Sequence, residues 1–177
     1  MRAFGQGSLS SFLKTGLDVV VVALWLALGA TALALAVTLL AQPFVGAAEP
    51  RGRFAELARL LRRGPPFAAL LAAAGVYWAA LLAVADRLRR VFATLIAGRP
   101  FDIGNVRRLQ GIGLALLVLE LAGYAVSMLA PLALGAPPRS HDRAVNLSGW
   151  FAILVVFVLA EVFREGARLQ AEAELTV

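Results

Sequence analysis

The sequence predicts an all-α integral membrane protein: a four-helix bundle with cytoplasmic helical extensions and one interfacial amphipathic helix. Of its 177 residues, 60% are hydrophobic and 16% are charged, whereas soluble domains average about 45–50% and about 25%. The hydrophobic residues gather in four long stretches, and none of these shows the alternation of a barrel strand. Because backbone polar groups in lipid must be satisfied within the chain, these stretches are predicted to be transmembrane helices.

The four predicted spans are residues 19–41, 67–85, 112–133 and 147–163. The first has no charged residue and as a helix would rise roughly 34 Å, enough to cross a hydrocarbon core of about 30 Å. It exceeds the roughly 7–15 apolar residues of a signal peptide, so we expect it to be a retained helix. All four spans belong to one membrane domain covering residues 1–177.

A short amphipathic helix is predicted between the first two spans, over residues 53–63. Apolar residues recur there at 54, 57, 60 and 61, with charged residues between them. This is helical periodicity with an apolar stripe, which is typical of a helix lying in the membrane interface. We expect it on the outer surface, with lipid as its partner.

The segment between the second and third spans, residues 86–111, predicts a cytoplasmic helical hairpin. The apolar stripe of the second span continues for about three turns, until Gly98 ends the helix. Asp102 is placed to cap the next helix, with Phe101 and Val106 as a hydrophobic staple.

Basic residues set the expected orientation. Ten lie on the side of the two termini and the hairpin, and seven lie on the opposite side. The excess predicts that both termini are cytoplasmic in a bacterial inner membrane. Four hairpin arginines are candidates to bind lipid headgroups, or else to pair with the acidic C-terminal segment: Arg87, Arg89, Arg90 and Arg107.

Two short motifs resemble those of a known family. The middle motif, G-R-P-F-D-I-G-N-V-R-R-L, contains Gly98, Pro100, Phe101, Asp102, Asn105, Arg108 and Leu109. The C-terminal motif, E-V-F-R-E-G, contains Glu161, Arg164, Glu165 and Gly166, and the chain closes with E-L-T-V. Together they resemble a family of small bacterial four-helix membrane proteins of unknown function. That resemblance implies a gene often lying beside a helix-turn-helix regulator, and hence a possible cytoplasmic protein partner.

A polar stripe crosses the third span, where Glu120, Tyr124 and Ser127 share one helix face. Glu120 is predicted near the middle of the bilayer, where an acid is costly and is a functional candidate. It could carry a proton or cation, with Tyr124 and Ser127 orienting it. Alternatively, it is a neutral structural acid bonded to Tyr124, Tyr77 or Thr31.

Glu161, near the end of the fourth span, has a structural interpretation. Arg164 and Arg168 follow it at spacings of three and seven residues, which place ion-pair partners on the same helix face.

The composition argues against an enzyme. The chain has no cysteine, and its single histidine, His141, lies beside Asp142 in a short loop. Such a pair makes neither a metal site nor a catalytic triad by itself. We therefore expect no catalytic residues, metal or cofactor. Since the positive charge flanks the spans, we expect contact with lipid and no direct contact with nucleic acid.

Three functions follow as hypotheses. The first is a non-catalytic regulatory or interaction protein that binds a soluble partner through the hairpin and the C-terminal segment. The second is a small oligomeric transporter or channel with Glu120 in its pathway. The third is an accessory subunit of a larger membrane complex.

Overall fold

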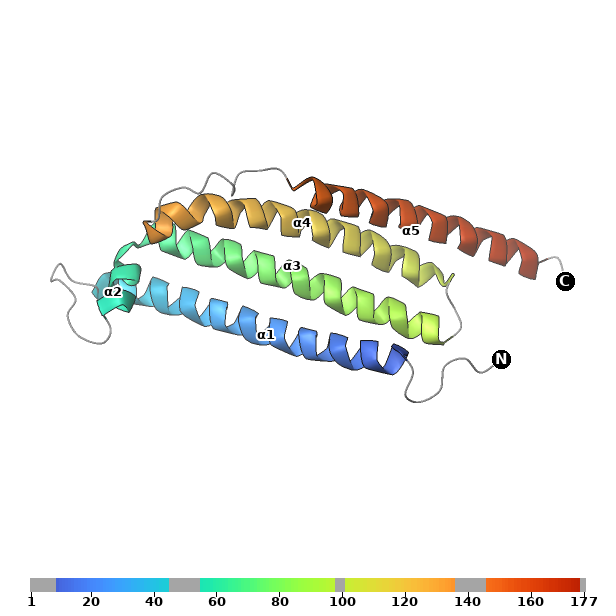
Figure 1. Cartoon of the computed structure of the whole chain (residues 1–177), viewed down its shortest axis with the longest axis horizontal. Coiled ribbons are helices and arrows are strands. Elements are labelled where there is room, and N and C mark those ends of the chain that lie inside the picture. Colours follow the sequence, from blue (N-terminus) through green and yellow to red (C-terminus); the bar gives the residue numbers. More distant parts are fainter. Residues whose placement is uncertain (1–8, 45–54, 98–100, 136–145, 176–177) are drawn as a thin grey trace. The chain divides into compact units, whose positions relative to one another are not determined.

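The computed structural model describes residues 9–44, 55–97, 101–135 and 146–175, and within these ranges it contains helices and no strand. The elements are α1 (Leu9–Ala41), η1 (Gln42–Phe44), α2 (Ala55–Arg62), α3 (Pro65–Ile96), α4 (Ile103–Leu134) and α5 (Leu147–Glu174) (Figure 1). Among the described residues, α1, α3, α4 and α5 are long and apolar enough to cross a membrane. The predicted all-α membrane fold is confirmed.

Each predicted span lies inside a longer helix. Helix α3 continues without a break to Ile96, and α4 begins at Ile103, as the amphipathic stripe and the cap at Asp102 predicted. Gly98 and Pro100 lie outside the described residues. Helix α5 continues well past residue 163, to Glu174.

The helices contribute to two compact units. The first unit comprises Met1–Trp25, Ala80–Leu117 and Leu147–Val177, and the second comprises Leu26–Ala79 and Val118–Asn146.

The core of the first unit joins α3, α4 and α5. Leu109, Ile112 and Ala160 are buried together. The partly buried side chains packed around them are Val84, Leu88, Leu116, Val156 and Phe163. The last part of the fourth predicted span therefore packs against the hairpin segment. The two helices of the hairpin thus share this core with α5.

In the second unit, α2 is tied to the ends of two long helices. Gln42, just after α1, donates from Nε2 to the carbonyl oxygen of Leu61 at 2.8 Å. Arg63 donates from Nη1 to the carbonyl oxygen of Ala133, at the end of α4, at 2.9 Å. These bonds supply partners for carbonyl groups that a helix end leaves without an intrahelical donor. The short helix thus has protein partners in addition to the lipid predicted for it.

Candidate functional site

The corner where the hairpin turns into α4 is built as its motif predicts. The carboxylate of Asp102 accepts a hydrogen bond from the Gly104 N–H at 2.7 Å. Its carbonyl oxygen accepts from the Asn105 N–H at 2.8 Å. This is the geometry of a helix N-cap, so the predicted role of Asp102 is confirmed.

Asn105 locks the two arms of the hairpin together. Its side chain is fully buried, with no exposed surface. Its Oδ1 accepts from the Thr94 hydroxyl of α3 at 2.8 Å and from Nη1 of Arg108 at 2.9 Å. A buried amide needs such partners, because a polar group left unpaired inside a protein costs about 1–3 kcal/mol. Asn105, Arg108 and the buried Leu109 therefore hold the hairpin from within.

The two sequence motifs meet at Phe101. Its ring lies 5.7 Å, centroid to centroid, from the ring of Phe163 in α5. A Cβ atom on Gly166 would come within 2.6 Å of the Phe101 ring, so only glycine allows this close approach. The sequence predicts a local staple role for Phe101 and a meeting of the two segments only through charges, whereas the structure joins the motifs through Phe101.

Beyond this contact, residues 164–174 of α5, here called the α5 extension, run past the hairpin corner. A groove of about 810 Å³ lies between the corner and the extension. Phe101 and Ile103 at its edge are 41% and 63% exposed. Its lining residues are Phe101, Asp102, Ile103, Arg164, Glu165, Ala167, Arg168, Gln170 and Ala171. The groove thus combines exposed apolar side chains with charges of both signs.

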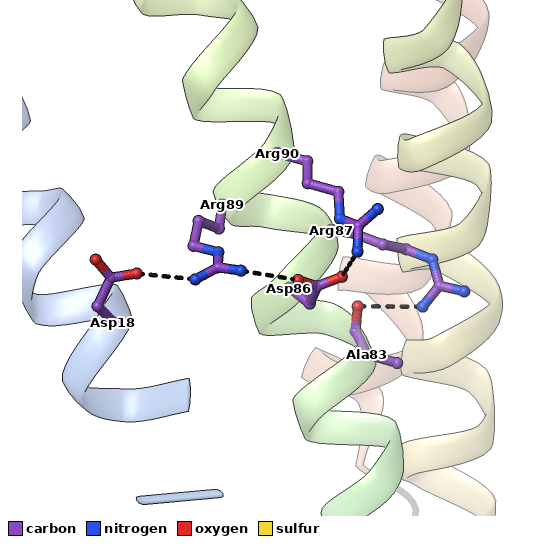
Figure 2. Close-up of polar contacts among 6 residues, drawn as sticks. All are labelled: Asp18, Ala83, Asp86, Arg87, Arg89 and Arg90. Carbon is purple, nitrogen blue, oxygen red and sulfur yellow. Dashed lines mark hydrogen bonds and ion pairs between the residues drawn. The ribbon is translucent and has the colours of Figure 1, made fainter. Parts of the chain in front are cut away.

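Two of the four hairpin arginines predicted to bind headgroups form ion pairs with protein carboxylates (Figure 2). Arg89 bridges Asp18 of α1 at 3.1 Å and Asp86 of α3 at 3.3 Å. Arg90 pairs with the second oxygen of Asp86 at 2.7 Å. These side chains are 31–63% exposed, so the pairs form at a surface.

Arg87 lies between two helices. Its Nη1 donates to the carbonyl oxygen of Ala83 at 3.1 Å, and its side chain packs against Gly111 of α4. Figure 2 shows Arg87 pointing from α3 toward the neighbouring helix. Arg107 is exposed. Headgroup binding by these arginines stays a prediction, but three of them also have contacts within the protein.

The charges of α5 form pairs along the helix. Arg164 pairs with Glu161, as predicted. Arg168 pairs with Glu165 at 2.6 Å and with Glu172 at 3.7 Å, rather than with Glu161 as proposed. The prediction that the acidic segment meets the hairpin through ion pairs gains no support from these contacts. The observed contact between motifs is the apolar one at Phe101.

The partner of Glu120 in the second unit is a residue that the sequence analysis missed. Asn146, just before α5, donates from Nδ2 to Oε1 of Glu120 at 3.0 Å. Its backbone N–H donates to the Tyr124 hydroxyl, also at 3.0 Å. Glu120 and Tyr124 therefore both contact Asn146.

This contact also bears on the predicted depths. The sequence places Glu120 near the middle of the bilayer and residue 147 at its outer boundary, whereas Asn146 contacts Glu120 directly. Glu120 and Asn146 therefore lie at the same level.

Other polar groups of the stripe bond to their own helices. Ser127 donates to the carbonyl oxygen of Gly123 or of Tyr124, each at 3.0 Å. Thr31 donates to the carbonyl oxygen of Ala27 at 2.8 Å. Tyr77 makes an edge contact with the ring of Trp78. Glu120 is thus held by Asn146 rather than by the predicted Tyr77 or Thr31, and Ser127 does not orient it.

In the described ranges, no three histidine, cysteine or carboxylate side chains converge in a way that could hold a metal ion. His141 lies outside those ranges. The buried polar cluster at the hairpin consists of an amide, a hydroxyl and a guanidinium, which serve packing and helix joining.

The chain matches one family of known sequences. Residues 54–177 match the family described as "Protein of unknown function (DUF2975)". The chain belongs to this family. The match includes both motifs and the helices from α2 to α5, so the contact between Phe101 and α5 lies wholly within the DUF2975 region. The family description gives no activity. Neither the curated proteins nor the solved structures contain a significant match to the chain.

Proposed function

We propose that this DUF2975 protein is a non-catalytic protein of the bacterial inner membrane that binds a soluble partner. The binding surface is the groove between the hairpin corner and the α5 extension. Both termini and this groove lie on the cytoplasmic side, as the distribution of basic residues favours. By resemblance to its family, a neighbouring helix-turn-helix regulator is a candidate partner.

The observation that supports this proposal is the α5 extension itself. Helix α5 continues to Glu174, well beyond its contact with Phe101. Isolated helices of this length are marginal in water, and most helical stability in proteins comes from packing. The intrahelical pairs of Arg164 and Arg168 supply part of the missing stability. An extended helix beside an open groove suits a partner segment that packs along both.

The groove has the composition of a protein-binding surface. Phe101 and Ile103 offer exposed apolar area, and the small side chains of Ala167 and Ala171 also line the groove. Aromatic anchors and arginines with a polar rim are typical of protein interfaces. Arg164 and Arg168, which form ion pairs with glutamates of α5, also line the groove beside these apolar side chains.

The transporter hypothesis receives less support from the second unit. The Glu120 carboxylate accepts from an amide donor of Asn146, and Ser127 bonds to its own helix. Such donors hold a carboxylate in place and compete with a cation for its oxygen. We therefore assign Glu120 a structural role, in which it fixes the start of α5.

Photo-crosslinking in native membranes tests the proposal. A photoreactive phenylalanine analogue replaces Ile103 at the groove edge or, as a control, Leu114 in the apolar stretch of α4, where the side chain is 58% exposed. We expect a soluble protein adduct from position 103 and lipid adducts alone from position 114. Filling the groove with Ala171→Trp should reduce the protein adduct, while Ala93→Trp at an exposed site on α3 should not. No protein adduct at position 103 would contradict the proposal.

A further inference from the structure

The arginines near the middle of α3 are of two kinds. Arg89 and Arg90 have carboxylate partners, because Asp18 and Asp86 lie 2.7–3.3 Å from their guanidinium nitrogens. Arg87 instead donates from Nη1 to a backbone carbonyl oxygen of its own helix. Figure 2 shows Arg87 pointing toward the neighbouring helix, while Arg89 points toward Asp18. Within the described part of the chain, the charge of Arg87 therefore has no carboxylate beside it.

Arg107 of α4 lies on the face toward which Arg87 points. The Arg87 side chain rests on Gly111, where a Cβ atom would come within 2.5 Å of its Nε. Arg107 precedes Gly111 by four residues, so the two positions are neighbours on one face of α4. Arg107 is exposed and forms no ion pair with any carboxylate in the described ranges. Two arginines whose charges are not offset thus share one face of the hairpin.

This face lies where the uncharged stretches of both helices end. On α3, residues 67–85 carry no charge and Arg87 follows two positions later, and on α4 residues 109–119 carry none. The contact of Arg87 with Gly111 brings these two limits to the same level. Because charged side chains are costly in hydrocarbon, this level is the boundary between the lipid tails and the headgroups.

The anion that suits two arginines at this boundary is a lipid phosphate. Guanidinium groups bind phosphate oxygens through parallel N–H donors, and basic pockets between membrane helices hold anionic headgroups. The three arginines of α3 face only the two aspartates Asp18 and Asp86, and Arg107 adds a further positive charge. This local excess favours a headgroup with a net negative charge over a zwitterionic one.

We infer that Arg87 and Arg107 bind the phosphate of one anionic phospholipid. Gly111 leaves the space in which the Arg87 side chain crosses to α4. Leu114, three residues further along the same helix, is 58% exposed and offers apolar surface to the acyl chains. Arg89 and Arg90 are not part of this site, because aspartates already offset their charges. The site shares no residue with the groove at the α5 extension, so it extends the proposed function without depending on it.

Native mass spectrometry of the full chain in detergent, titrated with phosphatidylglycerol or phosphatidylethanolamine, measures this binding. We expect one phosphatidylglycerol to bind at lower concentration than phosphatidylethanolamine. Arg87→Gln and Arg107→Gln should each weaken phosphatidylglycerol binding about fivefold, the usual effect of one basic side chain at an anionic surface. Equal binding of the two lipids would overturn the assignment.

Arg89→Gln is the matched control, since it removes the same charge from the same helix. It should change the affinity less than about twofold, because Asp18 and Asp86 already offset that charge. A loss equal to that of Arg87→Gln would show that net charge alone attracts the lipid, and the site would be rejected. Arg107 is exposed, so its variant tests the site even if Arg87→Gln does not fold.

A variant without any change in charge tests the geometry. Gly111→Ala forces the Arg87 side chain off α4, and it should weaken phosphatidylglycerol binding about as much as Arg87→Gln. Gly16→Ala in α1 is the control, because a Cβ atom there meets nothing within 4 Å. Unchanged binding in Gly111→Ala would overturn the site.

Competition with inorganic phosphate separates a lipid headgroup from a soluble phosphate, which has the same chemistry. Equimolar inorganic phosphate should leave phosphatidylglycerol bound, because the acyl chains add to the affinity of a lipid. Displacement by inorganic phosphate would overturn the lipid assignment. A protein adduct from position 103 in a chain that binds no phosphatidylglycerol would reject this site and leave the proposed function standing.

Discussion

The two units of the chain satisfy their polar groups in different ways. In the first unit, side chains pair with side chains across helices: Arg89 reaches Asp18, and Asn105 binds Thr94. In the second unit, hydroxyls bond to carbonyl oxygens of their own helices, as Thr38 does at 2.7 Å. The exception there is the side-chain pair of Glu120 with Asn146, while Gln42 and Arg63 donate to carbonyl oxygens of other elements.

This difference indicates which hydrogen bonds fix the register between neighbouring helices. A hydroxyl that bonds to its own helix is satisfied at any position of the neighbouring helices, so it fixes no register. A side-chain pair between helices is formed in one register only. Asn105 and Glu120 should therefore matter for the arrangement of the helices, while Thr38 and Ser127 should matter little.

The largest expected effect is that of Asn105→Leu. The substitution removes the Asn105 acceptor of the Arg108 guanidinium and one of the two acceptors within reach of the Thr94 hydroxyl, which keeps the carbonyl oxygen of Val91. We expect a loss of about 2–4 kcal/mol in the free energy of unfolding, measured by steric trapping in lipid bicelles. Thr38→Val removes an equally buried hydroxyl that bonds to its own helix and should cost less than about 1 kcal/mol. Equal losses in the free energy of unfolding of the two variants would show that side-chain pairs between helices matter no more than hydroxyl bonds within a helix.

Glu120 tests the exception in the second unit. Glu120→Gln retains an oxygen that accepts from Asn146, so its free energy of unfolding should stay within about 0.5 kcal/mol of the native value. Glu120→Leu removes the acceptor and should cost about 1 kcal/mol, the usual size of a hydrogen bond between membrane helices. Ser127→Ala is the matched control and should have little effect. If Glu120→Gln instead abolishes a pH-dependent ion flux in liposomes, the acid belongs to a transport pathway and not to a structural contact.

The smallest effect is expected at the surface pair of Asp18 and Arg89. Both side chains are about half exposed, at 45% and 44%, and exposed pairs contribute little to stability because water and salt screen them. A double-mutant cycle with Asp18→Asn and Arg89→Gln should give a small coupling that shrinks in high salt. A coupling as large as the loss caused by Asn105→Leu would show that lipid, and not water, surrounds this ion pair.

The local features could be predicted because their causes lie within a few residues. The cap at Asp102 and the pair of Glu161 with Arg164 follow from spacings of two to four positions. The contacts of Arg87 with Gly111 and of Phe101 with Gly166 could not be predicted, because they join segments distant in the sequence. The motifs signalled that Phe101 and Gly166 matter, but not that they touch. Asn146 gave no signal, because it belongs to neither a motif nor a span.

By itself, the sequence determined that the chain forms four long apolar helices, where α4 and α5 begin, and that a short amphipathic helix follows the first span. Apolar length and helical periodicity are properties of consecutive residues, so no tertiary contact is needed to find them. Only the tertiary structure decided the register of α5 against α4, and with it the partner of Glu120 and the contact between the two motifs. An apolar helix can slide along its neighbour with little change in the apolar surface it exposes. Its position is therefore set by a few specific contacts, such as Phe157 with Gly113 and Phe163 with Phe101.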